Sequence, residues 1–291
     1  MRYAFVVPYA EETDFVDLAV LGEQSGWDLV FTWEAVYRCD AWATLAAAAM
    51  RTERIRLGTL ITPASRYKPW DLAQRVASVD RLSGGRVTLG VGLGAVNQNW
   101  LAFEPDEGRK TRAEKLDECL AIYAGLLAGQ PFAYAGRHWS AVPVTELIPP
   151  PPVQRPHPPV WCVGALVPGR IRQPSLARAA RWQGIFPAVA GGAEGHPGLT
   201  TAALAEITSR VRRERAQLGL DGAAYDVVVE GDSYGDFGQI HDAPAAWAEA
   251  GATWWVESWW DVPEGPDGLR EVRRRVAAGP PHDSARSSIP G

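Results

Sequence analysis

Short hydrophobic segments rich in β-branched and aromatic residues alternate along this chain with longer segments whose apolar residues recur every three or four positions. The short segments predict β-strands and the longer ones predict amphipathic helices. We expect strands at residues 3–8, 29–33, 55–62, 86–91, 160–163, 184–187, 225–230 and 253–257. We expect helices at residues 12–25, 41–51, 69–82, 112–127, 174–181, 200–217, 244–250 and 268–278. This alternation predicts a parallel sheet covered by helices.

About eight β/α units are present, which is the number that a closed (β/α)8 TIM barrel needs. The main rival is an open doubly wound sheet, which would carry a glycine-rich nucleotide fingerprint at its first βα turn. The first turn here, residues 8–12, contains no glycine. We therefore predict one α/β barrel domain over residues 1–279, with an insertion over the barrel mouth at about 97–158. Residues 280–291, rich in Pro and Ser, are expected to form a disordered tail.

The composition excludes several classes of function. A net charge of -5 gives no basic footprint for nucleic acid. No apolar run approaches the ~20 residues of a membrane span, and no signal-peptide pattern opens the chain, so we expect a cytoplasmic protein. Cys39, Cys119 and Cys162 are odd in number and far apart, which favours reduced thiols over disulfides. The five histidines are scattered, so no protein-built metal site is expected.

Barrel enzymes carry their chemistry at the carboxyl ends of the strands. Glu34, Glu230 and Glu257 follow or end predicted strands, and we expect them to converge on one mouth. Paired mouth carboxylates in a chain with thirteen tryptophans also fit a glycoside hydrolase, which is one alternative function. The tryptophans are either apolar filler or stacking surfaces for a flat ligand.

The glycine-rich segment from Gly90 to Gly94 follows the fourth predicted strand. As a dinucleotide fingerprint it is weak, because its third glycine comes one position early. Glycines nevertheless let a flat ligand approach the backbone, so Gly92, Leu93 and Gly94 are candidate cofactor contacts. The alternative is tight packing at the barrel rim.

A second candidate loop, residues 164–174, lies between the fifth predicted strand and a helix and carries Arg170 and Arg172. Free N–H groups at a helix start, together with an arginine, suit a phosphate group. The alternative is two solvated surface arginines. The sequence contains no G-x-S-x-G, Walker or H-E-x-x-H motif, which favours chemistry performed by a bound cofactor.

Several blocks of the sequence, in order and across nearly the whole chain, resemble the luciferase-like monooxygenase family. They are TERIRLGTLITP at residues 52–63, DRLSGGR at 80–86, LGVGLG at 89–94, PVW at 159–161, GIFP at 184–187 and AGATWW at 250–255. The resemblance implies a barrel with an insertion after the fourth strand, and FMN or the deazaflavin coenzyme F-420 at its mouth.

The resemblance also implies roles for particular residues. A bulge with a non-prolyl cis peptide supports the flavin ring in relatives, and its position here is Leu60–Ile61, followed by Thr62. By the same resemblance, residues 92–94 lie along the ring and ribityl chain. The resemblance further implies that Gly164, Ala165 and Arg170 hold the phosphate. Homodimers are common among relatives.

The chain departs from its relatives after the second strand, where many have Asp-His and this chain has Glu34-Ala35. The histidine that acts as acid or base in some deazaflavin enzymes is therefore absent. Glu34 remains the candidate catalytic carboxylate, and the histidine chemistry is not carried over.

We therefore expect an oxidoreductase that acts on a small organic substrate. In the preferred version, a separate reductase supplies reduced FMN, which reacts with oxygen in a pocket that excludes water. In the alternative, coenzyme F-420 exchanges a hydride with the substrate. A barrel that only binds flavin is a third interpretation.

Overall fold

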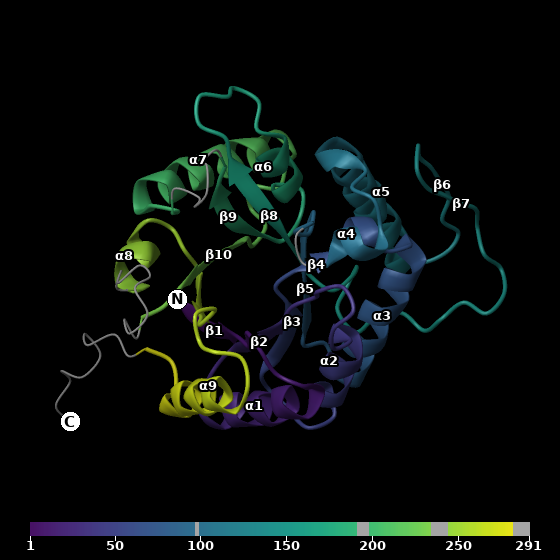
Figure 1. Cartoon of the computed structure of the whole chain (residues 1–291). Coiled ribbons are helices and arrows are strands. Elements are labelled where there is room, and N and C mark those ends of the chain that lie inside the picture. Colours follow the sequence, from purple (N-terminus) through teal and green to yellow (C-terminus); the bar gives the residue numbers. More distant parts are fainter. Residues whose placement is uncertain (97–98, 191–197, 234–243, 282–291) are drawn as a thin grey trace.

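The computed structural model describes residues 1–96, 99–190, 198–233 and 244–281. Within these ranges, parallel strands close into an eight-stranded barrel, which confirms the predicted fold class (Figure 1). The barrel strands are β1 (Arg2–Val6), β2 (Leu29–Thr32), β3 (Arg56–Thr59), β5 (Val87–Gly92), β8 (Val160–Leu166), β9 (Gly184–Val189), β10 (Asp226–Gly231) and β11 (Trp254–Ser258). Pairing of β1 with β11 and of β3 with β5 completes the ring.

Helices surround the barrel on its outside (Figure 1). They are α1 (Glu12–Gln24), α2 (Ala41–Ala49), the 3-10 turn η1 (Ala64–Arg66), α3 (Pro69–Leu82), α4 (Trp100–Phe103), α5 (Gly108–Ala128), α6 (Pro174–Ala179), α7 (Thr201–Gln217), α8 (Pro244–Glu249) and α9 (Pro266–Ala278). Local sequence explains several helix starts. The Asp40 carboxylate caps α2 by accepting from the N–H groups of Trp42 and Ala43. Pro69 begins α3 at a position where its missing N–H costs little.

The barrel strands separate two apolar cores. Alternate residues of each strand face opposite sides, so Trp254 and Val256 of β11 join the core inside the barrel, whereas Trp255 joins the core under the helices. The inner core also contains Phe31, Trp161 and other large side chains. A side chain therefore reaches the mouth only from an inward position at the carboxyl end of a strand.

The third predicted strand, residues 55–62, is interrupted. β3 ends at Thr59, a cis peptide joins Leu60 to Ile61, and the short strand β4 (Thr62–Pro63) then pairs with β5. The expected non-prolyl cis peptide at Leu60–Ile61 is thus confirmed.

We expected residues 97–158 to lie over the barrel mouth. Most of this segment lies elsewhere, so the expectation was wrong for it. α5 packs outside the barrel against α3 and η1, as the crossover helix between β5 and β8. The hairpin of β6 (Tyr134–Ala135) and β7 (Ser140–Ala141) lies at the side (Figure 1). The side-chain amide of Gln154 donates to the carbonyl of Val87, the first residue of β5, at 2.7 Å. The return segment therefore runs along the amino ends of the strands.

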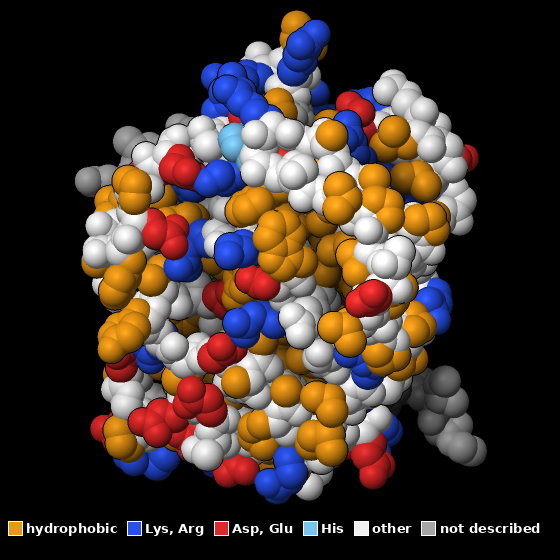
Figure 2. Space-filling model, turned by 90° about the vertical axis from the view of Figure 1, so that its right-hand side faces the viewer, with side chains coloured by type: hydrophobic (Ala, Val, Ile, Leu, Met, Phe, Trp, Pro, Cys, Tyr) orange, Lys and Arg blue, Asp and Glu red, His pale blue; other side chains and the backbone are white. Residues whose placement is uncertain are grey.

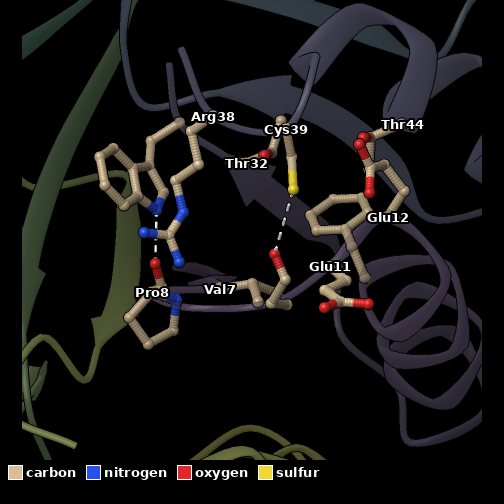
Figure 3. A pocket seen from close by; sticks show the side chains of 11 residues that line it. Val7, Pro8, Glu11, Glu12, Thr32, Arg38, Cys39 and Thr44 are labelled. Carbon is tan, nitrogen blue, oxygen red and sulfur yellow. Dashed lines mark hydrogen bonds between the residues drawn. The ribbon is translucent and has the colours of Figure 1, made fainter. Parts of the chain in front are cut away.

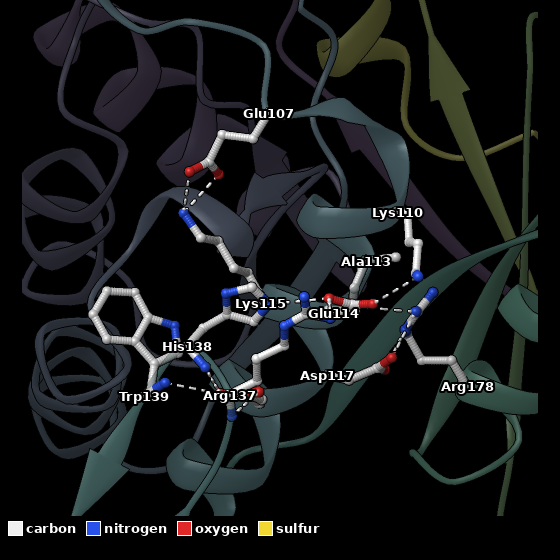
Figure 4. A network of polar contacts seen from close by, with 11 residues as sticks. Glu107, Lys110, Ala113, Glu114, Lys115, Asp117, Arg137, His138, Trp139 and Arg178 are labelled. Atoms are coloured by element: carbon white, nitrogen blue, oxygen red, sulfur yellow. Dashed lines mark hydrogen bonds and ion pairs between the residues drawn. The ribbon is translucent and has the colours of Figure 1, made fainter.

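Carboxylates of α5 anchor the hairpin (Figure 4). Glu118 accepts from the backbone N–H groups of Arg137, His138 and Trp139 at 2.8–3.0 Å. Glu114 lies 3.1 Å from the imidazole of His138. These contacts hold the hairpin on the outer surface, away from the strand ends.

The side of the molecule that carries α3, α5 and the hairpin mixes apolar with charged side chains (Figure 2). Trp70, Leu101 and Phe103 are among the exposed apolar residues of the chain. Scattered apolar residues are normal on a protein surface. No helix of the described residues has the length and apolar character that crossing a membrane requires. Most of the predicted tail lies outside the described residues.

Gly90 offers a test of the barrel's packing. A Cβ at this position would lie 2.0 Å from the carbonyl oxygen of Thr59, which is backbone and cannot move aside. We expect Gly90→Ala to lower the free energy of unfolding by about 1–3 kcal/mol, the usual cost of overpacking a core. Gly222→Ala is the matched control, because nothing lies within 4 Å of its Cβ position. Equal urea midpoints for the two variants would contradict the inward packing of β5.

Candidate active site at the mouth of the barrel

The floor of the mouth is apolar. Trp33, Ile61, Val163 and Trp260 are half-buried and pack on the inner core. The rings of Trp33 and Trp260 meet edge to face, with centroids 5.7 Å apart. The indole of Trp33 also donates to the carbonyl of Pro8 at 2.6 Å. These fixed aromatic walls suit a flat ligand.

Glu34 follows β2 at the edge of this floor, and both of its carboxyl oxygens accept hydrogen bonds. The hydroxyl of Thr62 donates to Oε1 at 2.7 Å, and the hydroxyl of Tyr67 donates to Oε2 at 2.8 Å. Thr62 lies in β4 and Tyr67 follows η1. The segment directly after β3 therefore orients the carboxyl group of Glu34.

A row of hydroxyl groups continues from Glu34 into the barrel wall. Thr62 Oγ1 lies 3.0 Å from Thr59 Oγ1. The Thr59 hydroxyl in turn donates to the Gly90 carbonyl at 3.0 Å and accepts from the Gly90 N–H at 3.2 Å. This network ties Glu34 to the middle of β5.

Burial raises the pKa of the Glu34 carboxyl, and the hydrogen bonds from Thr62 and Tyr67 oppose this effect only in part. Burial and the adjacent Glu34 also raise the pKa of Tyr67, so its hydroxyl keeps its proton and donates. A carboxyl group with a raised pKa is suited to taking up or releasing a proton near neutral pH.

Glu230 also lies at the mouth. It follows the inward-facing Val228 by two positions, and the indole N–H of Trp260 is 3.5 Å from its Oε2. The side chain of Glu230 is exposed at the mouth. Desolvation by the surrounding protein nevertheless raises the pKa of its carboxyl.

Glu257 does not join them. It lies on the outer side of β11, fully buried, and accepts from the Trp255 indole at 2.8 Å and from the Ser233 N–H at 3.0 Å. The expectation that Glu34, Glu230 and Glu257 converge was therefore wrong for Glu257. Of the three carboxylates, Glu34 and Glu230 alone lie at the mouth.

Neighbouring side chains occupy the space beside Gly92 and Gly94. A Cβ on Gly92 would lie 2.2 Å from Cδ1 of Ile61, and a Cβ on Gly94 would lie 2.5 Å from the ring of Trp100. A flat ligand therefore meets Ile61 and Trp100 before it meets these two glycines. Between them, the Leu93 carbonyl accepts from Arg112 at 3.3 Å. The alternative of tight rim packing describes this segment better.

The loop after β8 is also partly committed to internal contacts. The N–H groups of Ala165 and Val167 donate to the side chains of Ser175 and Gln173 at 3.1 and 2.9 Å. A Cβ on Gly164 would meet Ile185 under the helices rather than the mouth. The N–H groups of Ala165 and Val167 are therefore not available to bind a phosphate. The side chain of Arg170 is exposed and remains available.

A cleft of about 300 Å³ opens beside Glu34. Its lining comes from the loop between β2 and α2 and from the end of η1, and it comprises residues 34–41, Arg66 and Tyr67. A smaller hollow adjoins it between the loops that follow β1 and β2 (Figure 3). There Cys39 Sγ contacts the Ala10 carbonyl at 3.7 Å, and Arg38 contributes to both spaces.

Sequence reasoning missed Arg66 and Tyr67. Neither belongs to a periodic segment, because η1 interrupts the chain between β4 and α3. A usable signal was their position just after a predicted strand end. Among the described residues, no three His, Cys, Asp or Glu side chains form a group that could hold a metal ion.

Comparison with known proteins identifies the family of the chain. The family model for luciferase-like monooxygenases matches residues 6–258. The chain belongs to this family. Its closed barrel is the fold of solved members of this family of oxidoreductases.

One curated relative is an F-420-dependent glucose-6-phosphate dehydrogenase from Beutenbergia cavernae, 38% identical over 138 residues. The match covers 44% of this chain and 41% of that protein, so the chain matches less than half of the relative's length.

Two solved structures share the fold. A monooxygenase from Streptomyces bottropensis superimposes with a TM-score of 0.70 at 20% identity, covering 95% of this chain and 98% of that one. The coenzyme F-420-dependent tetrahydromethanopterin reductase from Methanopyrus kandleri gives 0.71 at 14% identity, with 96% and 98% covered.

The raised pKa of Glu34 makes stability depend on pH. Its folded pKa exceeds the ordinary value of 4.5, so the contribution of Glu34 to stability is full below pH 4.5 and is lost as the pH rises through the folded pKa. Glu34→Gln removes this loss. We expect the difference in Tm, variant minus wild type, to be small near pH 4 and to become more positive toward pH 8.

Glu249→Gln, on the exposed surface of α8, controls for the loss of one negative charge. Tyr67→Phe should have the opposite effect to Glu34→Gln, because losing a donor raises the pKa of Glu34 further and steepens the loss of stability with pH. A Tm difference for Glu34→Gln that is constant from pH 4 to pH 8 would show that Glu34 titrates normally.

Proposed function

We propose that this protein is a cytoplasmic oxidoreductase that binds a flavin-type cofactor at the barrel mouth and acts on a small organic substrate. FMN, reduced by a separate reductase and used with oxygen, is the preferred cofactor, and coenzyme F-420 is the alternative. The observation that carries the proposal is an apolar floor with tryptophan walls beside the carboxyl of Glu34, which Thr62 and Tyr67 hold by hydrogen bonds.

The residues of the mouth fit a flavin ring with one revision. Ile61 and Val163 would support the ring, with Trp33 and Trp260 beside it, because Ile61 and Trp100 occupy the space next to Gly92 and Gly94. Leu60 and Thr62, on either side of Ile61, remain part of this support. Leu93, Gly164 and Ala165 contribute backbone at the rim.

The protein's own residues supply orientation, water exclusion and a proton. When bound, the cofactor supplies the electrons or hydride. The apolar floor keeps water from competing with the substrate. Glu34 holds or accepts a proton at its carboxyl oxygens, while Thr62 and Tyr67 fix the direction in which those oxygens point.

A specific observation favours the F-420 alternative as second candidate. Oxidation of an alcohol removes a hydride from carbon and a proton from oxygen, so a base must stand near the substrate. Glu34 fits this role although the adjacent residue, Ala35, has no imidazole. The Beutenbergia cavernae relative is named for a reaction of this kind.

Titration of the purified protein with FMN and with coenzyme F-420 tests the proposal. We expect one of the two to bind with a micromolar Kd and to quench tryptophan fluorescence. Binding of neither would overturn the proposal. Stopped-flow oxidation of the reduced cofactor, with and without substrates, separates an enzyme from a barrel that only binds flavin.

Arg170 tests where the cofactor's phosphate lies. Because Arg170 is exposed, its ion pair with a phosphate is worth up to about 1 kcal/mol. Arg170→Ala should therefore weaken cofactor binding about threefold to fivefold, an effect measured by fluorescence titration. Arg210→Ala, which removes an equal charge from α7, is the control. Equal affinity of the two variants would place the phosphate elsewhere.

A further inference from the structure

Arg66 lines the cleft beside Glu34 and makes no side-chain hydrogen bond to any of the described residues. Only 20% of its side chain is exposed. Its nearest carboxylate is that of Glu104, with Oε2 3.6 Å from Arg66 Nε, which is too long for a hydrogen bond. Its Nε is buried with no acceptor in reach among the described residues. A buried N–H donor without an acceptor is costly, so the Nε of Arg66 favours a ligand that supplies one.

An aromatic ring fixes the direction of this guanidinium. Arg66 lies over the ring of Trp100, 4.9 Å from its centroid. Arg112 lies 5.5 Å from the centroid of the same ring. The indole N–H of Trp100 donates to Glu104 at 3.0 Å. Trp100 therefore supports the guanidinium of Arg66, a planar fork that can recognise a carboxylate or phosphate through two hydrogen bonds.

The charge around the cleft favours an anion. Arg38 also lines it, and its own carboxylate partner, Glu264, is 3.9 Å away. Of the acidic residues that face the cleft, Asp40 caps α2 and pairs with Arg75 at 3.4 Å. Glu34 is already occupied by Thr62 and Tyr67. Glu104 is 47% exposed, and the Oε2 that approaches Arg66 already accepts the Trp100 indole N–H at 3.0 Å.

We propose that this cleft binds the anionic group, a carboxylate or a phosphate, of the substrate, with Arg66 as its main ligand. The identification of the occupant as substrate rests on the proposed function above. Tyr67 follows Arg66 in the chain and donates to Glu34. An anion held by Arg66 therefore brings the rest of a small molecule next to the carboxyl that takes or gives its proton. Arg66 would select among substrates, and Glu34 would act on the one selected.

Calorimetric titration of the cofactor-free full chain, at low ionic strength, tests this site. The probes are phenyl phosphate and benzoate, which present the two anions on one ring, and benzyl alcohol as a neutral analogue. We expect at least one anion to bind and benzyl alcohol to bind at least tenfold more weakly. Arg66→Gln should weaken anion binding at least tenfold, and Arg66→Lys should restore part of it.

Two further variants make the outcome decisive. Glu104→Gln removes the competing carboxylate and should tighten anion binding, a result that stands even if Arg66→Gln fails to fold. Arg210→Gln controls for net charge and should bind as wild type does. Unchanged affinity in both Arg66→Gln and Glu104→Gln, or equal binding of the neutral analogue, would overturn the proposal. Intact anion binding in a protein that binds neither cofactor would instead overturn the proposed function alone.

Discussion

Every strand of a closed parallel barrel must pack against two interiors, one inside the ring and one beneath the helices. In this protein the alternation of side chains assigns Trp254 and Val256 to the first and Trp255 to the second. The inner interior is filled with large side chains as far as the carboxyl ends of the strands. Only there does an inward side chain meet a space that a ligand can enter. All the candidate chemistry therefore depends on which side of its strand a residue occupies.

This constraint explains which features of the fold and the site could be predicted from the sequence and which could not. The alternation of segments predicted the barrel and its strand ends, and the resemblance located the bulge at Leu60–Ile61. Glu257 was misplaced because a strand end alone does not show whether a residue faces inward or outward. Gly92 and Gly94 were predicted to contact a ligand because glycine leaves space beside the backbone. The sequence does not show that the side chains of Ile61 and Trp100 fill that space.

The excursion after β5 was misjudged for a related reason. Its length resembled that of a lid, but most of it is one long crossover helix and a hairpin that carboxylates of this helix hold in place. Arg66 and Tyr67 were overlooked because a single 3-10 turn has no periodic pattern. Their importance lies in long-range contacts, with Trp100 and Glu34, that only the closed barrel brings together.

The indole of Trp100 serves two compartments at once. One part of its ring fills the space beside Gly94 at the barrel rim, while its face supports Arg66 at the neighbouring cleft. A smaller residue at position 100 would loosen both compartments together. Natural or engineered shifts in substrate preference are thus expected to require coordinated replacements on η1 and α4, since neither element can be redesigned independently of the other.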